Sequence, residues 1–392
     1  MNFFKSFFKS KNSEKPKHSH NKIFQTHHLT NEEFWEWFQE YENDFFHAVK
    51  NDDNVNENFF NLIAPKLEEL RPGYSFLTGM LDDETAVLNI SSNGNIKNIV
   101  FVEELVKSAP KLENWKIIAH KPARDLEELE LEMGSMTFNK DSMWFYATED
   151  EQLHDNINIT VVHADCTPKN REAVTTGVLL TLDYFLGEMK FITTIDDITV
   201  ISPKEAKKEL IPIAQLDDYI TKREQEFIEK YEDKYHDSIN DEFLPIEGRS
   251  EIGMPVMAIV NSTLLFWNSK ASHPWIVEIE ITFDGDRQGM PNNKTSMLMN
   301  HFEESLKDEL PDEEGYIEVG SETCDGTRLI YVVCQDYRIA SKVISEHIEK
   351  HEEILNIDYT IYKDKYWKML DKYADKVLQN ELPMPKLLMR RR

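Results

Sequence analysis

The clearest pattern of apolar and polar positions lies between residues 275 and 283. Apolar side chains alternate there with polar ones, and the apolar set is Trp275, Val277, Ile279, Ile281 and Phe283. Successive side chains of a strand point to opposite faces of a sheet, so this alternation predicts a strand with one buried face. The polar face of that strand carries Glu278 and Glu280.

Helical and extended patterns follow in order along the rest of this region. Apolar residues recur every three or four positions within 298–310 and within 337–348, which predicts two helices. Between them, two apolar runs flank Asp325-Gly326, a dipeptide typical of a β-hairpin turn. A last strand closes the set. The order βαββαβ predicts a ferredoxin-like sandwich for residues 251–370, with two helices on one antiparallel sheet.

Residues 30–250 predict a larger N-terminal domain of mixed α+β type. Thr30 and Glu33 fit a capping box, and apolar residues at helical spacing after them predict an amphipathic helix. A second helix is expected to bend or restart near Pro65. The stretch 236–255 combines mixed charge, Gly and Pro with little periodicity, so it predicts the domain boundary. The elements expected in between are strand, strand, helix and strand within 74–123, three strands within 129–165, a helix over 168–186, a strand within 189–202 and a long charged helix over 213–235.

Both ends of the chain are basic and lie outside these patterns. Residues 1–29 predict a disordered lead, and residues 371–392 predict a mobile tail interrupted by prolines. The lead contains four phenylalanines that would share one helical face: Phe3, Phe4, Phe7 and Phe8. One interpretation places this face on an anionic membrane surface, and the favoured one docks it on the protein or leaves it in solvent. A further hypothesis is that both basic ends fold back onto the acidic body.

The charge of the chain narrows its partners. It carries 72 acidic and 44 basic residues among 392, a formal net charge of -28. A surface of this sign repels a phosphate backbone, so nucleic-acid binding is disfavoured. An apolar content of 40% is that of a globular protein, and no apolar run reaches the length of a transmembrane segment.

The cysteine pattern bears on compartment and cofactors. Cys166, Cys324 and Cys334 lie far apart, with no paired spacing. A disulfide framework and a structural zinc site are both disfavoured, and a reducing cytosol fits best. A cytoplasmic protein without a cofactor is therefore expected.

The loop after the strand at 275–283 contains the first candidate binding residues, Asp284, Asp286 and Arg287. The two aspartates occupy the first and third positions of a calcium-loop pattern. The twelfth position, which should supply a bidentate carboxylate, is Thr295. Arg287 is the only cation of the loop, which also disfavours a phosphate site. The favoured interpretation is a corner that joins a strand to a helix.

A second candidate site lies where a predicted strand ends near residue 163. His163 and Asp165 would act as a base and its orienting partner, with Cys166 as nucleophile and with Asp196 nearby. Side chains two positions apart share one face of a strand, so this geometry is open. A chain with 13 histidines and 72 carboxylates produces such neighbours by chance, and a solvated strand end is the favoured interpretation.

A ferredoxin-like sheet also raises the hypothesis of RNA recognition, in which aromatic residues on an open face stack on bases. Here the open face of the first strand would carry Glu278 and Glu280, and the strand after the hairpin turn lacks a basic, glycine-aromatic signature. Carboxylates would repel RNA, so this function is disfavoured.

The segments "HPWIVEIEITFDGDRQGMP", "DGTRLIYVV" and "IDYTIYKDKYW" give the chain a family resemblance. Over approximately residues 255–368 it resembles the bacterial domain-of-unknown-function family 695, and the region upstream resembles the N-terminal half of longer Bacteroidetes-type members. The resemblance implies a cytosolic bacterial protein. It implies no established activity and no catalytic residues.

Two functions remain open at this stage. The favoured one is a non-enzymatic protein-binding or regulatory module that contacts another protein, because no complete catalytic constellation is present. The alternative is an enzyme of unknown class, with a site in the N-terminal domain near His163, Asp165 and Asp196. The alternative requires these three side chains to converge on one pocket.

Overall fold

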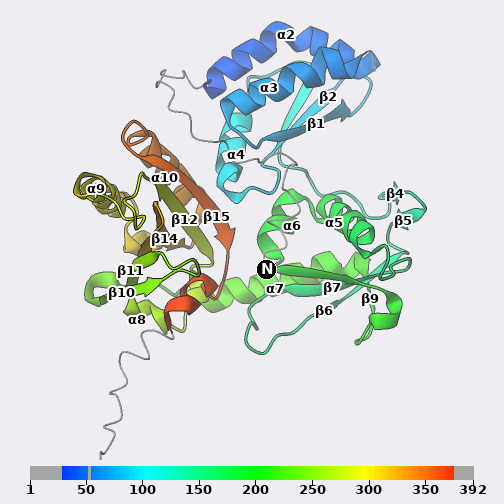
Figure 1. Ribbon diagram of the computed structural model, residues 1–392. Helices are drawn as coiled ribbons and strands as arrows, with labels where there is room; N and C mark the ends of the chain where they lie inside the picture. Colours follow the sequence, from blue (N-terminus) through cyan, green and yellow to red (C-terminus); the bar gives the residue numbers. More distant parts are fainter. Residues whose placement is uncertain (1–28, 52–53, 375–392) are drawn as a thin grey trace, which may run out of the picture. The chain divides into compact units, whose positions relative to one another are not determined.

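The structure, a computed structural model, describes residues 29–51 and 54–374. The predictions for the phenylalanine-rich lead and for the tail beyond residue 374 lie outside the described residues. The chain is α+β and forms two compact units, Met1–Glu226 and Phe227–Arg392, called here the N-terminal and C-terminal units (Figure 1). Within the described residues, no helix combines the length and the apolar character that a membrane crossing needs.

The N-terminal unit begins with α2 (Asn31–Asn51), which has the expected capping box. The Thr30 N–H donates to the Glu33 carboxylate at 2.9 Å, and the Glu33 N–H donates to the Thr30 hydroxyl at 3.2 Å. A short π-helix, η1 (Asn56–Phe60), then leads into α3 (Asn61–Leu70). Pro65 lies inside α3, and the irregular turn lies before it.

The first sheet consists of β1 (Ser75–Met80), β2 (Ala86–Ser91) and β3 (Trp115–Ala119). Strands β2 and β3 run parallel and are connected by α4 (Ile99–Lys107), as a βαβ crossover requires. The face of β2 that carries Ala86, Leu88 and Ile90 is buried in one core with residues of α2, α3 and α4. Asn89 and Ser91 therefore project from the opposite face, at the edge where both parallel strands end.

The second sheet has the order β8-β7-β6-β9. Residues 129–165 contain one strand more than expected, because the first predicted strand is a small hairpin. The elements here are β4 (Leu131–Met133), β5 (Met136–Phe138), β6 (Met143–Ala147), β7 (Asn158–His163), α5 (Arg171–Leu186), β8 (Asp197–Ile201), β9 (Ile211–Pro212) and α7 (Leu216–Tyr231).

The strand predicted within 189–202 is present only in the second half of that segment. Its first part is a helix, α6 (Glu188–Thr194), and only its second part is β8. A short apolar run does not distinguish a strand from a buried helix by periodicity. Gly187, with φ +76°, separates α5 from α6 and starts the new helix.

The C-terminal unit contains a fully antiparallel six-stranded sheet in the order β10-β11-β13-β14-β12-β15. The hairpin at Asp325-Gly326 is confirmed, with φ of +48° and +75°, as a two-residue turn with two left-handed positions requires. The chain follows the expected order βαββαβ through β12 (Trp275–Thr282), α9 (Asn293–Glu309), β13 (Tyr316–Cys324), β14 (Thr327–Cys334), α10 (Tyr337–Glu349) and β15 (Asn356–Lys363).

Two strands precede this set, and they shift the boundary between the units. Strands β10 (Phe243–Arg249) and β11 (Pro255–Asn261) extend the sheet beyond β13, so the stretch where the sequence predicted the domain boundary is part of the C-terminal unit. Pro245 and the weak periodicity of this stretch fit an edge strand. The units divide within α7, whereas the sequence placed the boundary at residue 250.

The two faces of this sheet are covered differently. On one face, Tyr337 of α10 packs against Trp275 with ring centroids 4.5 Å apart. On the other face, Trp367, Leu370 and Tyr373 join the core of the sheet. This face also carries Glu278, so the expectation of an open sheet face is wrong: the chain's own residues 367–373 cover its centre. The ferredoxin-like assignment itself stays a prediction.

Candidate functional site

His163 lies at the end of β7 and is fully buried. Its Nε2 donates to the carbonyl oxygen of Thr137 at 3.1 Å, and its Nδ1 accepts the backbone N–H of Asp165 at 3.1 Å. Burial lowers the pKa of His163, so the neutral ring is favoured. Both ring nitrogens are therefore engaged by the backbone.

The other residues of this candidate do not converge on the ring. Cys166 is buried, and burial raises the pKa of its thiol. The Asp196 carboxylate accepts the N–H of Ile157 at 2.7 Å. Because Asn158 pairs with the residue after Asp196, that carboxylate lies at the opposite end of β7 from His163, about 16 Å away. The structure thus places Cys166 near His163 but separates Asp196 from both.

The loop with Asp284, Asp286 and Arg287 is exposed and closes on itself. Oδ1 of Asp286 accepts the N–H groups of Gln288 and Met290 at 2.8 and 3.0 Å. The loop also contacts the β13–β14 turn through its own backbone. These contacts are those of a corner between a strand and a helix. Among the described residues, no group of three or more His, Cys, Asp or Glu side chains is arranged to hold a metal ion.

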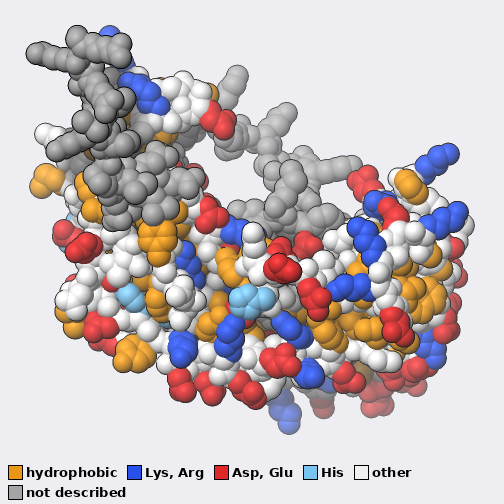
Figure 2. All heavy atoms as spheres, turned by 90° about the horizontal axis from the view of Figure 1, so that it is seen from below, with side chains coloured by type: hydrophobic (Ala, Val, Ile, Leu, Met, Phe, Trp, Pro, Cys, Tyr) orange, Lys and Arg blue, Asp and Glu red, His pale blue; other side chains and the backbone are white. Residues whose placement is uncertain are grey.

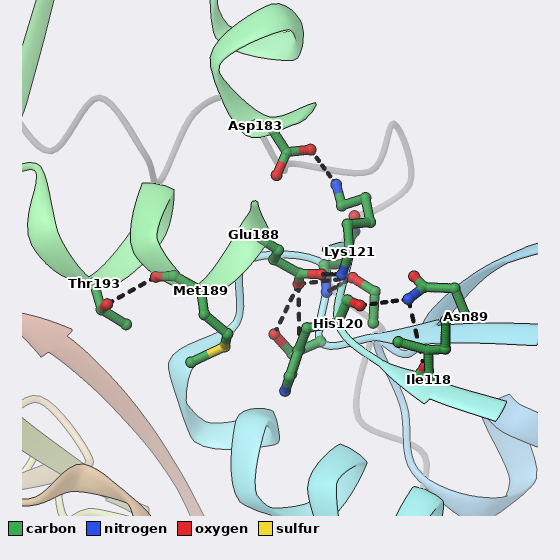
Figure 3. Close-up of polar contacts among 11 residues, drawn as sticks. Asn89, Ile118, His120, Lys121, Asp183, Glu188, Met189 and Thr193 are labelled. Carbon is green, nitrogen blue, oxygen red and sulfur yellow. Dashed lines mark hydrogen bonds and ion pairs between the residues drawn. The ribbon is translucent and has the colours of Figure 1, made fainter. Parts of the chain in front are cut away.

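A polar cluster that the sequence did not reveal lies where the parallel strands β2 and β3 end. Ser91 and Ser92 come from the end of β2, His120 follows β3, and Glu188 begins α6. Figure 3 shows the Glu188 carboxylate at the start of α6 pointing toward His120 and Lys121, which follow β3. The cluster is closed to solvent, because four of its residues are each 4% exposed or less: Ser91, Ser92, His120 and Glu188.

Hydrogen bonds from three residues hold the Glu188 carboxylate. Its Oε1 accepts the hydroxyls of Ser91 and Ser92 at 2.7 and 3.2 Å, and its Oε2 accepts the N–H of Lys121 at 3.1 Å. The Nδ1 atom of His120 lies 3.7 Å from Oε1. Burial raises the pKa of Glu188, but His120, Ser91 and Lys121 outweigh this effect and lower it to about 2.

The backbone of His120 has a conformation that is unusual for a residue other than glycine. His120 adopts φ +60°, and neither of its ring nitrogens has a hydrogen-bond partner. A Cβ on Gly187 would lie 2.7 Å from the Ala123 nitrogen, which shows how closely the segment after β3 passes the start of α6. Glu188 thus lies at the edge of a sheet where two parallel strands end, a place where ligands often bind, and connects the ends of β2 and β3 to α6.

The C-terminal unit contains a pocket of about 260 Å³ beside α9. It lies beside α9, on the face of the sheet that carries this helix, where α9 leaves β10 and β11 uncovered. Apolar side chains of both α9 and the sheet line it, and its polar lining includes three carboxylates. The lining residues that the argument uses are Phe243, Glu303, Leu306, Lys307, Asp312 and Glu318.

An exposed apolar strip continues this pocket along β10 and β11. Phe243 lines the pocket, and Pro245 projects from the same face two positions further along β10. Ile259 lies opposite Pro245 in the register, and Met257 follows it. Phe243, Met257 and Ile259 are 39%, 53% and 51% exposed. We call the pocket and this strip together the α9 groove.

Acidic side chains set the charge of the α9 groove. Three carboxylates line the pocket: Glu303 pairs with Arg328 at 3.2 Å and Glu318 pairs with Lys307 at 2.6 Å, so the net negative charge of the pocket comes from Asp312. Burial raises the pKa of Glu303, and nearby Arg328 opposes that effect. Hydrogen bonds from Ser238 lower the pKa of Asp312 to about 2. The strip adds the exposed carboxylate of Glu247, opposite Met257.

The α9 groove combines an apolar floor with a negative rim, which suits an extended segment that carries apolar and basic side chains. Sequence patterns did not predict this groove. Phe243 and Pro245 lie in the stretch that predicted the domain boundary, and their alternation with Leu244 and Ile246 spans too few residues to stand out.

Comparisons with known proteins identify only the C-terminal region. Residues 253–373 match the model of a family described as "Family of unknown function (DUF695)". This match confirms the resemblance found in the sequence, and it covers β11 and α9 of the groove. Neither a curated protein nor a solved structure matches the chain.

Proposed function

We propose that this chain is a non-enzymatic protein-binding module and that the α9 groove of its C-terminal unit is the binding surface. The observation that carries the proposal is the continuity of a lined pocket with an exposed apolar strip on two strands. Phe243, Met257 and Ile259 are each more than a third exposed on one face of the sheet. Contiguous apolar surface of this kind marks interaction sites in soluble proteins.

The partner is a protein segment with apolar side chains flanked by Lys or Arg. In this proposal, apolar side chains of the partner fill the pocket beside Leu306 and cover Ile259, and its basic side chains lie near Glu247 and Glu318. The net charge of -28 favours a basic partner over an acidic one and speeds its association. Acidic, basic and apolar side chains are interspersed over the face shown in Figure 2, without a broad basic field.

A protein fits the α9 groove better than a small molecule does. A pocket of about 260 Å³ is smaller than most sites for drug-sized ligands. The apolar strip extends beyond it along an edge strand, where an extended segment finds both side-chain contacts and backbone hydrogen-bonding groups. The catalytic alternative has less support, because His163 has both ring nitrogens engaged and Asp196 lies at the other end of β7.

Site-specific photo-crosslinking in the cell of origin tests the proposal. A photoreactive phenylalanine analogue replaces Ile259 in the α9 groove or, as a matched control, Ile339 on α10, which is 53% exposed against 51% for Ile259. We expect a discrete covalent adduct with one protein from position 259 and none from position 339. Equal adducts from both positions, or none from either, would contradict the proposal.

A further inference from the structure

The last described residues fix where the C-terminal tail leaves the fold. Tyr373 is 2% exposed, and its hydroxyl donates to the Glu322 carboxylate. Lys372 pairs with the same carboxylate at 3.0 Å. The chain therefore leaves the C-terminal unit beside β13, on the face of the sheet opposite the α9 groove.

The remaining 18 residues, 375–392, are long enough to reach the α9 groove. Glu322 and Glu318 lie four positions apart on β13, about 13 Å. Passing around the edge of the sheet crosses β11 and β10, about 10 Å, and the thickness of the sheet adds about 10 Å. Residues 375–381 cover the first part of this path, about 20 Å around the edge to the strip at Ile259, because seven extended residues span about 24 Å; the docked residues 382–392 themselves cover the remaining distance along the strands to the pocket.

The end of the tail has the composition that the α9 groove selects. Residues 382–392 read "LPMPKLLMRRR", which supplies apolar side chains followed by three arginines and contains no acidic residue. Pro383 and Pro385 restrict the backbone to extended conformations, so less conformational entropy is lost when the segment is held beside a strand. The acidic rim and the basic segment are complementary in charge.

We propose that residues 382–392 occupy the α9 groove of their own molecule and compete there with the partner. This inference rests on the proposed function, because it treats the groove as a protein-binding surface. A tethered segment is present at an effective concentration on the order of 1 mM. Even a segment with a dissociation constant of about 0.1 mM would then fill the groove and weaken partner binding about tenfold.

The test compares the full chain with a chain that ends at residue 379, a cut made beyond the described residues, which end at residue 374. A fluorescent peptide of residues 380–392 is titrated into each, and binding is followed by anisotropy. We expect saturable binding to the shortened chain and at least about tenfold weaker binding to the full chain, whose own tail occupies the groove. Absent binding to the shortened chain, or equal binding to both, would overturn the proposal.

Matched substitutions locate the peptide on the surface. Ile259→Arg in the shortened chain should abolish peptide binding, and Ile339→Arg, which adds the same charge at equal exposure, should leave it unchanged. Loss with both variants, or with neither, counts against docking in the α9 groove. A peptide of residues 1–12 serves as the rival occupant: if it binds and the tail peptide does not, the assignment to the tail is wrong.

The two proposals fail separately. Suppose that photo-crosslinking at Ile259 gives its adduct, but the tail peptide does not bind the shortened chain. The groove then binds a partner, and its regulation by the tail is excluded. If peptide binding is present but photo-crosslinking of the chain that ends at residue 379 gives no adduct with another protein, the tail docks and the proposed function is excluded.

Discussion

The carboxylate of Glu188 lies 3.7 Å from Nδ1 of His120, inside a cluster where both side chains are almost fully buried. The two residues come from different elements of the N-terminal unit, and their contact connects the end of β3 to the start of α6. Buried charges are stable only when hydrogen bonds and a partner of opposite charge compensate for lost hydration. The cluster therefore makes the arrangement of this unit depend on a few polar side chains.

Removing the Glu188 carboxylate should destabilise the N-terminal unit. Glu188→Ala leaves the hydroxyls of Ser91 and Ser92 and the N–H of Lys121 without their acceptor, and we expect a loss of about 3 kcal/mol. Hydrogen exchange of peptides from β2 and β3 measures the loss. Glu132→Ala, at an exposed position of the same unit, should change exchange little. Equal effects of the two substitutions would show that the cluster does not stabilise the unit.

The Glu188 carboxyl should also make stability depend on pH in the acid range. Its pKa is about 2 in the folded protein against a usual 4.5, so the unfolded chain takes up the proton first as the pH falls. Its contribution, about 3 kcal/mol, is complete above about pH 4.5 and is lost as the pH falls toward 2.

The Glu188→Gln variant tests this contribution. The carboxylate of Asp183, on α5, pairs with the ammonium group of Lys121 beside the cluster, and burial raises its pKa. Asp183 therefore acts with the opposite sign and favours the folded state as the pH falls. Both proteins keep Asp183, but the charge of Glu188 also raises the pKa of Asp183, so the difference between them reports Glu188 together with its effect on Asp183. Hydrogen exchange should show this difference shrinking between about pH 5 and pH 2. A constant difference would contradict the assignment.

Gly187 should tolerate no side chain. Its φ is +76°, and a Cβ would lie 2.7 Å from the backbone of Ala123, so Gly187→Ala adds a steric clash to backbone strain. Gly134 has a similar φ of +65°, but a Cβ there would have no atom within 4 Å, so Gly134→Ala measures the backbone strain without a clash. We expect about 1 kcal/mol for Gly134→Ala and at least about 3 kcal/mol for Gly187→Ala, measured by thermal unfolding. Similar losses would show that the close approach is relaxed at little cost.

The negative rim of the α9 groove should contribute to binding the basic tail peptide. Glu247→Lys in the shortened chain should weaken that binding severalfold at low ionic strength and less at high ionic strength, because salt screens the attraction. Glu349→Lys, an exposed position on α10, makes the same change in net charge away from the groove. If both substitutions weaken binding equally, only the total charge matters and the rim has no specific role.

Local patterns in the sequence predicted the elements whose cause is local. The alternation from Trp275 to Ile281 predicted β12, and Asp325-Gly326 predicted the hairpin turn. Helix α6 was missed because its apolar run is short, and with it Glu188, whose role appears only when α6 meets the ends of β2 and β3. The α9 groove depends in the same way on contacts between distant segments. Phe243, Ile259 and Leu306 carry no motif and acquire their meaning from the order of the strands.

The most direct measurement concerns the protein that photo-crosslinking at position 259 identifies. Its affinity is measured for the chain ending at residue 379, for the same chain with Ile259→Arg and for the same chain with Ile339→Arg. A partner that binds in the α9 groove predicts a loss of at least about 30-fold for Ile259→Arg, roughly 2 kcal/mol, and no change for Ile339→Arg. Equal affinity of all three proteins would contradict the groove as the binding surface.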